Sequence, residues 1–141
     1  MRSKLDDLEA RIAYLERAGS LDYTALTDYS STSTIIGWSA YTTKEIKYKM
    51  IGSVYFVFFN IAGTSNSTTT YFTLPITLSA NWVIHRSICR GVDNGTPTIV
   101  YGRLPSGALP GNQVEFFTLA GAALQNTGTK SIEGCLTIYA S

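Results

Sequence analysis

His85 is the only histidine of this 141-residue chain, so a nucleophilic triad of the Ser/His/Asp kind would have to use it. It lies in the alternating segment 82–88, on the same face as Val83 and Ser87. This position fits a strand histidine whose ring is satisfied by a neighbour or by water. The sequence therefore predicts no nucleophilic catalysis.

Carboxylates are the second kind of residue that could do chemistry, because glycosidases place two of them on opposite sides of the bond that they cleave. The acidic residues beyond the N-terminal segment are Asp22, Asp28, Glu45, Asp93, Glu115 and Glu133. Spacing alone pairs none of them, although Glu115 and Glu133 could meet across strands. A glycan hydrolase would need two facing carboxylates in a groove, and we predict that the chain is not an enzyme.

Metal and cofactor sites have no signature in the sequence. His, Cys, Asp and Glu do not cluster at the spacing of metal ligands, and there is no phosphate-cradling glycine loop with a lysine. We expect neither a metal nor a cofactor. Cys89 and Cys135 are predicted to be buried thiols that pack as small apolar residues. A disulfide between them is the alternative if the protein matures outside a cell.

The sequence contains more residues that are suited to binding a ligand than residues that are suited to catalysis. Aromatic rings can cover the apolar face of a sugar, and planar polar groups can bind its hydroxyls. The candidate ligand-binding residues are Trp38, Tyr41, Trp82, Arg90, Asp93, Asn94, Tyr101 and Arg103. Trp38 and Tyr41 are expected to flank a Ser-Ala turn, and Asp93 and Asn94 to lie at a hairpin tip. The alternative is that both tryptophans anchor the core or an interface and that the polar groups are only solvated.

Composition excludes several classes of function. Only 15% of the residues are charged and the net charge is +1, whereas an average soluble domain has about 25% charged residues. Nucleic-acid binding needs clustered Lys and Arg, so we do not expect it. No apolar run reaches the roughly 20 residues of a membrane span, so membrane insertion is not expected either. The N-terminus is too charged for a secretory signal.

The first nineteen residues carry a heptad pattern. Its apolar seam consists of Met1, Leu5, Leu8, Ile12 and Leu15, spaced alternately four and three residues apart. In this register Lys4 and Arg11 occupy g positions, and Glu9 and Glu16 occupy the e positions that follow, so a parallel coiled coil would bring opposite charges together at each contact. We predict a parallel coiled-coil stub over residues 1–19. A single amphipathic helix lying on its own domain is the alternative.

From residue 21 onward the hydrophobic period changes from helical to two, which is typical of strands. The expected strands are 44–50, 54–61, 71–74, 82–88, 98–104, 114–119 and 132–139. We predict an all-β, antiparallel sandwich or jelly roll over 35–141, joined to the stub by an irregular linker over 20–34. Segment 54–61 is apolar on both faces, so a neighbouring subunit is expected to cover the side that faces away from the core.

This arrangement resembles the C-terminal knobs of bacteriophage tail fibres and virion fibres. Residues 48–52, the apolar segment 54–61, Gly63 and the Phe-Thr-Leu-Pro motif of 72–75 follow each other as in those proteins, where an apolar strand after a glycine turn is followed by a polar loop and a Thr-Leu-Pro motif. The segment 132–139 is similar to their last strand. The resemblance covers about residues 40–140 and includes no catalytic signature.

The resemblance implies a homotrimeric receptor-binding knob on the surface of a phage particle that is assembled in the bacterial cytoplasm. Its partners would be a glycan or protein of the bacterial surface and other virion proteins. Three weak sites on one axis would bind by avidity. A purely architectural decoration protein is the alternative. A signalling knob of the complement or tumour-necrosis-factor type is disfavoured, because the chain has neither a secretory signal nor a disulfide framework.

Overall fold

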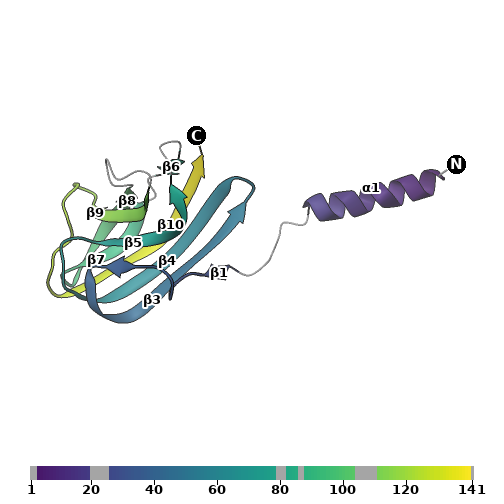
Figure 1. Ribbon diagram of the computed structural model, residues 1–141. Helices are drawn as coiled ribbons and strands as arrows, with labels where there is room; N and C mark the ends of the chain where they lie inside the picture. The colour runs from purple at the N-terminus through teal and green to yellow at the C-terminus, as the bar shows by residue number, and fades with distance from the viewer. Residues whose placement is uncertain (1–2, 20–25, 79–81, 86–87, 104–110, 141) are drawn as a thin grey trace.

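The computed structural model describes residues 3–19, 26–78, 82–85, 88–103 and 111–140, and only the backbone at 14–19, 82–85 and 140. It contains one helix and ten strands (Figure 1). Their bounds are α1 (Lys4–Gly19), β1 (Thr27–Asp28), β2 (Ile35–Ile36), β3 (Trp38–Ile51), β4 (Val54–Ser65), β5 (Tyr71–Leu78), β6 (Trp82–His85), β7 (Ile88–Asp93), β8 (Thr96–Arg103), β9 (Gly111–Thr118) and β10 (Thr129–Ala140).

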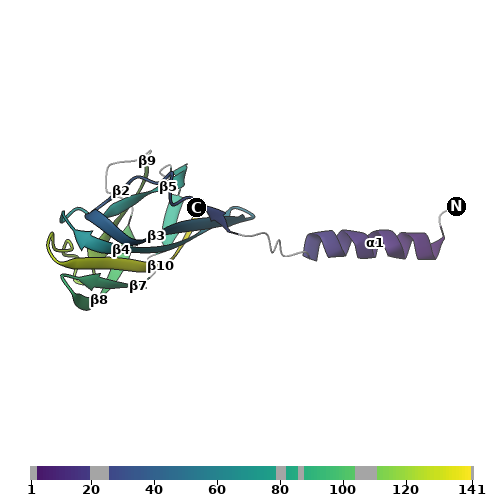
Figure 2. The same cartoon turned by 90° about the horizontal axis from the view of Figure 1, so that it is seen from below.

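Helix α1 begins at a reciprocal cap. The backbone N–H of Asp6 donates to Ser3 Oγ (3.1 Å), and the backbone N–H of Ser3 donates to a carboxylate oxygen of Asp6 (3.2 Å). The helix ends at Gly19, where the sequence predicts its end, and it lies apart from the sheet in two perpendicular views (Figures 1 and 2). The helix itself is confirmed. Within the described residues it is neither long nor apolar enough to cross a membrane.

The strands form one curled antiparallel sheet in the order β1-β3-β4-β10-β7-β8-β9-β5-β2, and β6 also pairs with β10. Strands β3 and β4 pair over most of their length, as do β4 and β10. Since the curl lets one face of the sheet enclose the core, the other face is turned outward (Figures 1 and 2). The all-β prediction is confirmed.

Two tight turns form where the sequence predicts them. Gly52 has φ +61° between β3 and β4, and Asn94 and Gly95 have φ values of +48° and +79° between β7 and β8. Glycine and asparagine are the residues that tolerate this left-handed region at least cost, which fixes the turns and therefore the register of both hairpins.

Two predicted boundaries are wrong. Residues 38–51 form the single strand β3, with irregular register near Trp38 and Tyr41, so these two side chains do not flank a turn. The predicted linker over 20–34 also ends earlier, because Thr27–Asp28 pairs with β3 as strand β1. Tyr29 then donates its hydroxyl to the carbonyl of Leu74 (3.2 Å), which attaches the segment to the core. Because the segment is locally polar, its sequence did not predict these long-range contacts.

The core lies inside the curl and includes seventeen buried apolar residues. Its centre is a cluster of three phenylalanines, Phe59 of β4, Phe72 of β5 and Phe116 of β9, whose ring centroids are 5.1–5.3 Å apart. Strand β4 is distant in the sheet order from β5 and β9, which are neighbours, so the cluster joins opposite parts of the curled sheet. Aromatic contacts of this kind contribute beyond their buried area.

Gly63 of β4 allows β3 to approach closely. A Cβ atom at this position would overlap the backbone of Ala40 and lie against the Cα of Tyr41. Gly63→Ala is therefore expected to lower the free energy of unfolding by about 3 kcal/mol, measured by urea denaturation. Gly52→Ala is the control, because a Cβ there meets nothing within 4 Å and only the positive φ is strained, at about 1 kcal/mol. An equal loss in both variants would contradict the close approach.

Candidate functional site

Trp38, a predicted ligand platform, is a core residue. It is buried, and its indole N–H donates to the carbonyl of Lys130 (3.0 Å). Trp38 therefore anchors the core, which was the alternative to ligand binding in the sequence analysis. Tyr41 lies beside it with ring centroids 6.4 Å apart, and its hydroxyl donates to the carbonyl of Ile35 (3.3 Å). The side chains of Trp82 and His85 lie outside the described part of the structure.

Lys130 is a buried cation that the sequence did not single out. Its side chain is 1% exposed, and its ammonium donates to the carbonyl of Ser67 (2.6 Å) and to Thr70 Oγ1 (3.0 Å). Burial lowers the pKa of Lys130 from 10.5 to about 8, and a weaker attraction to Asp93 opposes that change. The nitrogen lies 5.6 Å from the centroid of the Trp38 ring. Lys130 ties β10 to the polar loop that precedes β5.

Asp93 and Asn94 stabilise a loop contact at the tip of the β7–β8 hairpin. The backbone N–H of Gln125 donates to the carboxylate of Asp93 (2.7 Å), and the amide of Asn94 donates to Gln125 Oε1 (3.2 Å). A Cβ on Gly128 would collide with Asn94, so the two loops pack tightly. Asp93 and Asn94 therefore stabilise the fold at this end of the domain.

Tyr101 and Arg103 of β8 lie on the outer face of the sheet, together with Phe117 of β9. The guanidinium carbon of Arg103 is 3.9 Å from the centroid of the Phe117 ring, and the Tyr101 and Phe117 rings are 6.1 Å apart. The structure therefore joins these two predicted ligand residues in one cluster. Arg90 belongs to a different part of the same face, and the predicted residues whose side chains the structure describes do not converge on one site.

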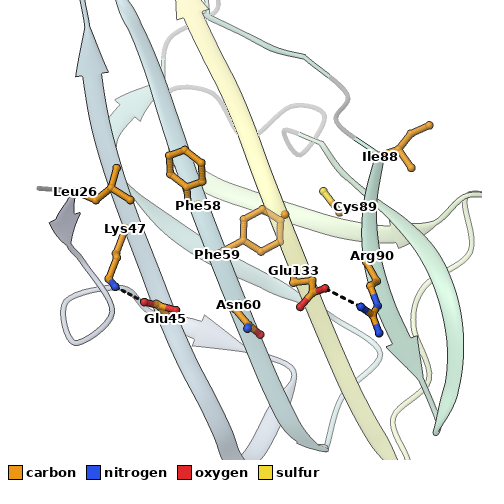
Figure 3. Close-up of a pocket in the computed structure, with 11 residues that line it drawn as sticks. Leu26, Glu45, Lys47, Phe58, Phe59, Asn60, Ile88, Cys89, Arg90 and Glu133 are labelled. Atoms are coloured by element: carbon orange, nitrogen blue, oxygen red, sulfur yellow. Dashed lines mark ion pairs between the residues drawn. The ribbon is translucent and has the colours of Figure 1, made fainter. Parts of the chain in front are cut away.

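A groove with a volume of about 600 Å³ crosses the outer face over β3, β4, β10 and β7 (Figure 3). We call it the outer groove, and its lining includes Leu26, Glu45, Lys47, Phe58, Asn60, Ile88, Arg90 and Glu133. Only Arg90 of these was predicted to bind a ligand. Phe58 is 40% exposed and Ile88 is the most exposed large apolar residue of the described sheet.

Strand alternation and register position the groove residues. Val57, Phe59 and Ile61 of β4 point into the core, so Phe58 and Asn60 between them point outward. Phe58 is directly opposite Lys47 on β3 and Cys135 on β10. Asn60 is directly opposite Glu45 on one side and Glu133 on the other. Phe58 and Cys135 thus lie beside a polar row in the groove, and Lys47 lies at the β3 end of their own row.

The charged groups of the groove form two ion pairs. Lys47 pairs with Glu45, and Arg90 pairs with Glu133 at 3.4 Å (Figure 3). The hydrogen bond that the Lys47 ammonium donates to the Glu45 carboxylate is the main reason why the pKa of Lys47 is raised. Two cations and two carboxylates balance one another, so the groove has no net charge to attract a charged ligand.

The expected meeting of Glu115 and Glu133 does not occur. Glu115 is on β9, opposite Tyr71 and Arg103, whereas Glu133 is on β10 and two strands lie between them. The carboxylates that do share a groove are Glu45 and Glu133, on opposite sides of Asn60. Each is paired with its own cation, Glu45 with Lys47 and Glu133 with Arg90.

Cys89 and Cys135 are thiols that are not joined to each other by a disulfide. Burial raises the pKa of Cys89 to about 11, with a smaller contribution from Cys135. Burial also raises the pKa of Cys135. Because the thiolate is the reactive form, both residues suit packing rather than chemistry. Among the described residues no group of His, Cys, Asp and Glu could hold a metal ion.

Phe58 is the exposed aromatic residue of the outer groove that was not among the predicted ligand-binding residues. Its signal was present in the run Val54–Ile61, which is apolar at consecutive positions, because an outward phenylalanine must follow from such a run in a strand. Comparisons of the chain with protein-family models, with curated proteins and with solved structures find no match.

Proposed function

We propose that this chain is the attachment domain of a bacteriophage tail fibre or virion fibre. In the proposed assembly, a short parallel coiled coil of three α1 helices carries three β-domains of the sandwich or jelly-roll type. Each domain binds a glycan or protein of the bacterial surface. The resemblance of residues 40–140 to fibre knobs supports this assignment to a phage particle.

The observation that carries the proposal is the exposed apolar seam of α1. Leu5, Leu8 and Ile12 are between 46% and 64% exposed in the single chain, and the helix lies apart from the sheet (Figure 1). A helix of sixteen residues is marginally stable in water on its own. Association with copies of itself would bury the seam and pair Lys4 with Glu9 and Arg11 with Glu16.

Binding of the intact chain to an array of bacterial surface polysaccharides and to isolated cell envelopes tests the proposal. We expect retention on one envelope type and loss of retention when that envelope's glycans or proteins are removed. An assembled trimer that binds no envelope would favour the second candidate, an architectural decoration protein of the virion. The charges of the outer groove are paired with one another, so none is left unbalanced to attract a receptor. This observation favours the architectural candidate.

A further inference from the structure

The outer face of the sheet is more apolar than a face exposed to water should be. An antiparallel sheet with one solvated face places polar residues there. Here Phe58 is opposite Cys135, and farther along the sheet Ile88 is opposite Tyr101, which is opposite Phe117. An apolar row thus extends across neighbouring strands, well beyond the groove.

Other exposed apolar side chains enlarge this face. Ile51 and Ile99 are each about half exposed, and both are at outward positions of their strands. A surface of this extent is larger than the single aromatic platform on which one sugar ring stacks. Contiguous apolar surface at this scale marks a protein–protein contact.

The charged groups of the outer face are compatible with a contact between two copies of this chain, which carry the same charges. The Lys47–Glu45 and Arg90–Glu133 pairs leave no net charge, so a second copy would meet no uncompensated charge of its own sign. The rim of a protein–protein interface is polar and accessible to solvent, so ion pairs beside the apolar residues are compatible with such a contact.

The chain connection brings this face close to the stalk. Leu26 lines the outer groove and follows the last residue of α1, Gly19, by only seven residues. Seven residues reach at most about 25 Å when fully extended. Copies joined by a parallel coiled coil would therefore keep their Leu26 residues, and with them this edge of the outer face, within about 25 Å of the end of the stalk.

We propose that the outer groove and the apolar face around Phe58 are the surface on which copies of this chain contact one another beneath the stalk. The occupant of the groove is a neighbouring copy, which buries Phe58 and Ile88. This inference rests on the proposed function for the existence of the oligomer, and it adds the surface that holds the β-domains together.

The test compares the molar masses of four full-length chains by light scattering after gel filtration. They are the wild type, a stalk variant (Leu8→Asp with Ile12→Asp), the stalk variant with Phe58→Glu, and the stalk variant with Tyr41→Glu. Tyr41 is the matched control, because it is also 40% exposed but lies outside the outer groove. Far-UV circular dichroism of each variant checks that the sheet is retained.

We expect a mass of three chains for the wild type, the stalk variant and the Tyr41→Glu control, and a threefold lower mass when Phe58→Glu is added. A trimer that persists with Phe58→Glu would overturn the inference and leave the proposed oligomer intact. A monomeric wild type would overturn the oligomer itself. Loss of polysaccharide binding by Phe58→Glu in a chain that stays trimeric would assign the groove to a ligand and also overturn the inference.

If the Phe58→Glu variant fails to fold, Phe58→Ala in the same stalk variant replaces it. Protection of the β4 and β10 amides from hydrogen exchange is then followed against protein concentration. We expect protection to rise with concentration in the stalk variant and to rise less with Phe58→Ala. Concentration-independent protection in a trimeric stalk variant would contradict a contact at this face.

Discussion

Phe72→Ala is expected to lower the free energy of unfolding by about 4 kcal/mol. Phe72 is fully buried, its ring is 5.3 Å from both the Phe59 and the Phe116 ring, and its strand position is opposite Ile35 of β2. Alanine would leave a cavity where these strands of the curled sheet meet. The two surrounding rings belong to two other strands, β4 and β9, which limits how far the cavity can collapse.

Urea denaturation at one protein concentration measures this loss, because a change in self-association would otherwise alter the apparent stability. Phe72→Leu keeps most of the volume and is expected to cost about 1 kcal/mol. Leu119→Ala removes an exposed side chain and should change stability by less than about 0.5 kcal/mol. A Phe72→Ala loss as small as that of Leu119→Ala would refute the central position of the phenylalanine cluster.

Lys130→Met is expected to change how stability depends on pH. The folded-state pKa of Lys130 is about 8 and that of the unfolded chain is about 10.5. Between these values the unfolded state holds more protons, so raising the pH stabilises the wild type. Below pH 8 Lys130 is protonated in both the folded and the unfolded state. The folded state then buries an ammonium ion, and the gain in stability with rising pH is absent. The shift corresponds to about 3 kcal/mol gained by the wild type relative to the variant across this window.

The measurement is the difference in free energy of unfolding between wild type and Lys130→Met at intervals from pH 7 to pH 10.5. Cys89 acts in the opposite direction above pH 9, because its folded-state pKa of about 11 is raised, but it is present in both proteins and cancels in the difference. Lys44→Met, which removes an exposed ammonium, is the control and should give a nearly constant difference. A constant difference for Lys130→Met as well would contradict the burial of its charge.

Local patterns predicted the elements that depend on neighbours in sequence. The heptad spacing predicted the helix and its end at Gly19, and Gly52 and Asn94–Gly95 predicted two turns, because capping and positive φ are local requirements. The run Val54–Ile61, which is apolar on both faces, also indicated that one apolar face would remain outside the core, and Phe58 is exposed there.

Side-chain placement across the sheet could not be predicted in this way. Whether Trp38 binds a ligand or packs inside depends on the pairing of β3 with β4 and on the carbonyl of Lys130, which is 92 positions away. The encounter of Glu45 with Glu133 likewise requires the order β3-β4-β10, in which strands distant in sequence become neighbours. Residue types alone carry no information about that order.

We propose that copies of this chain associate in threes through the α1 seam and the outer face of the sheet. The molar mass of the intact chain in solution, measured by light scattering, is the direct test of this association. We expect three times the 15.4 kDa of one chain. A mass of 15.4 kDa would contradict it, and α1 would then be an amphipathic helix without a partner of its own kind.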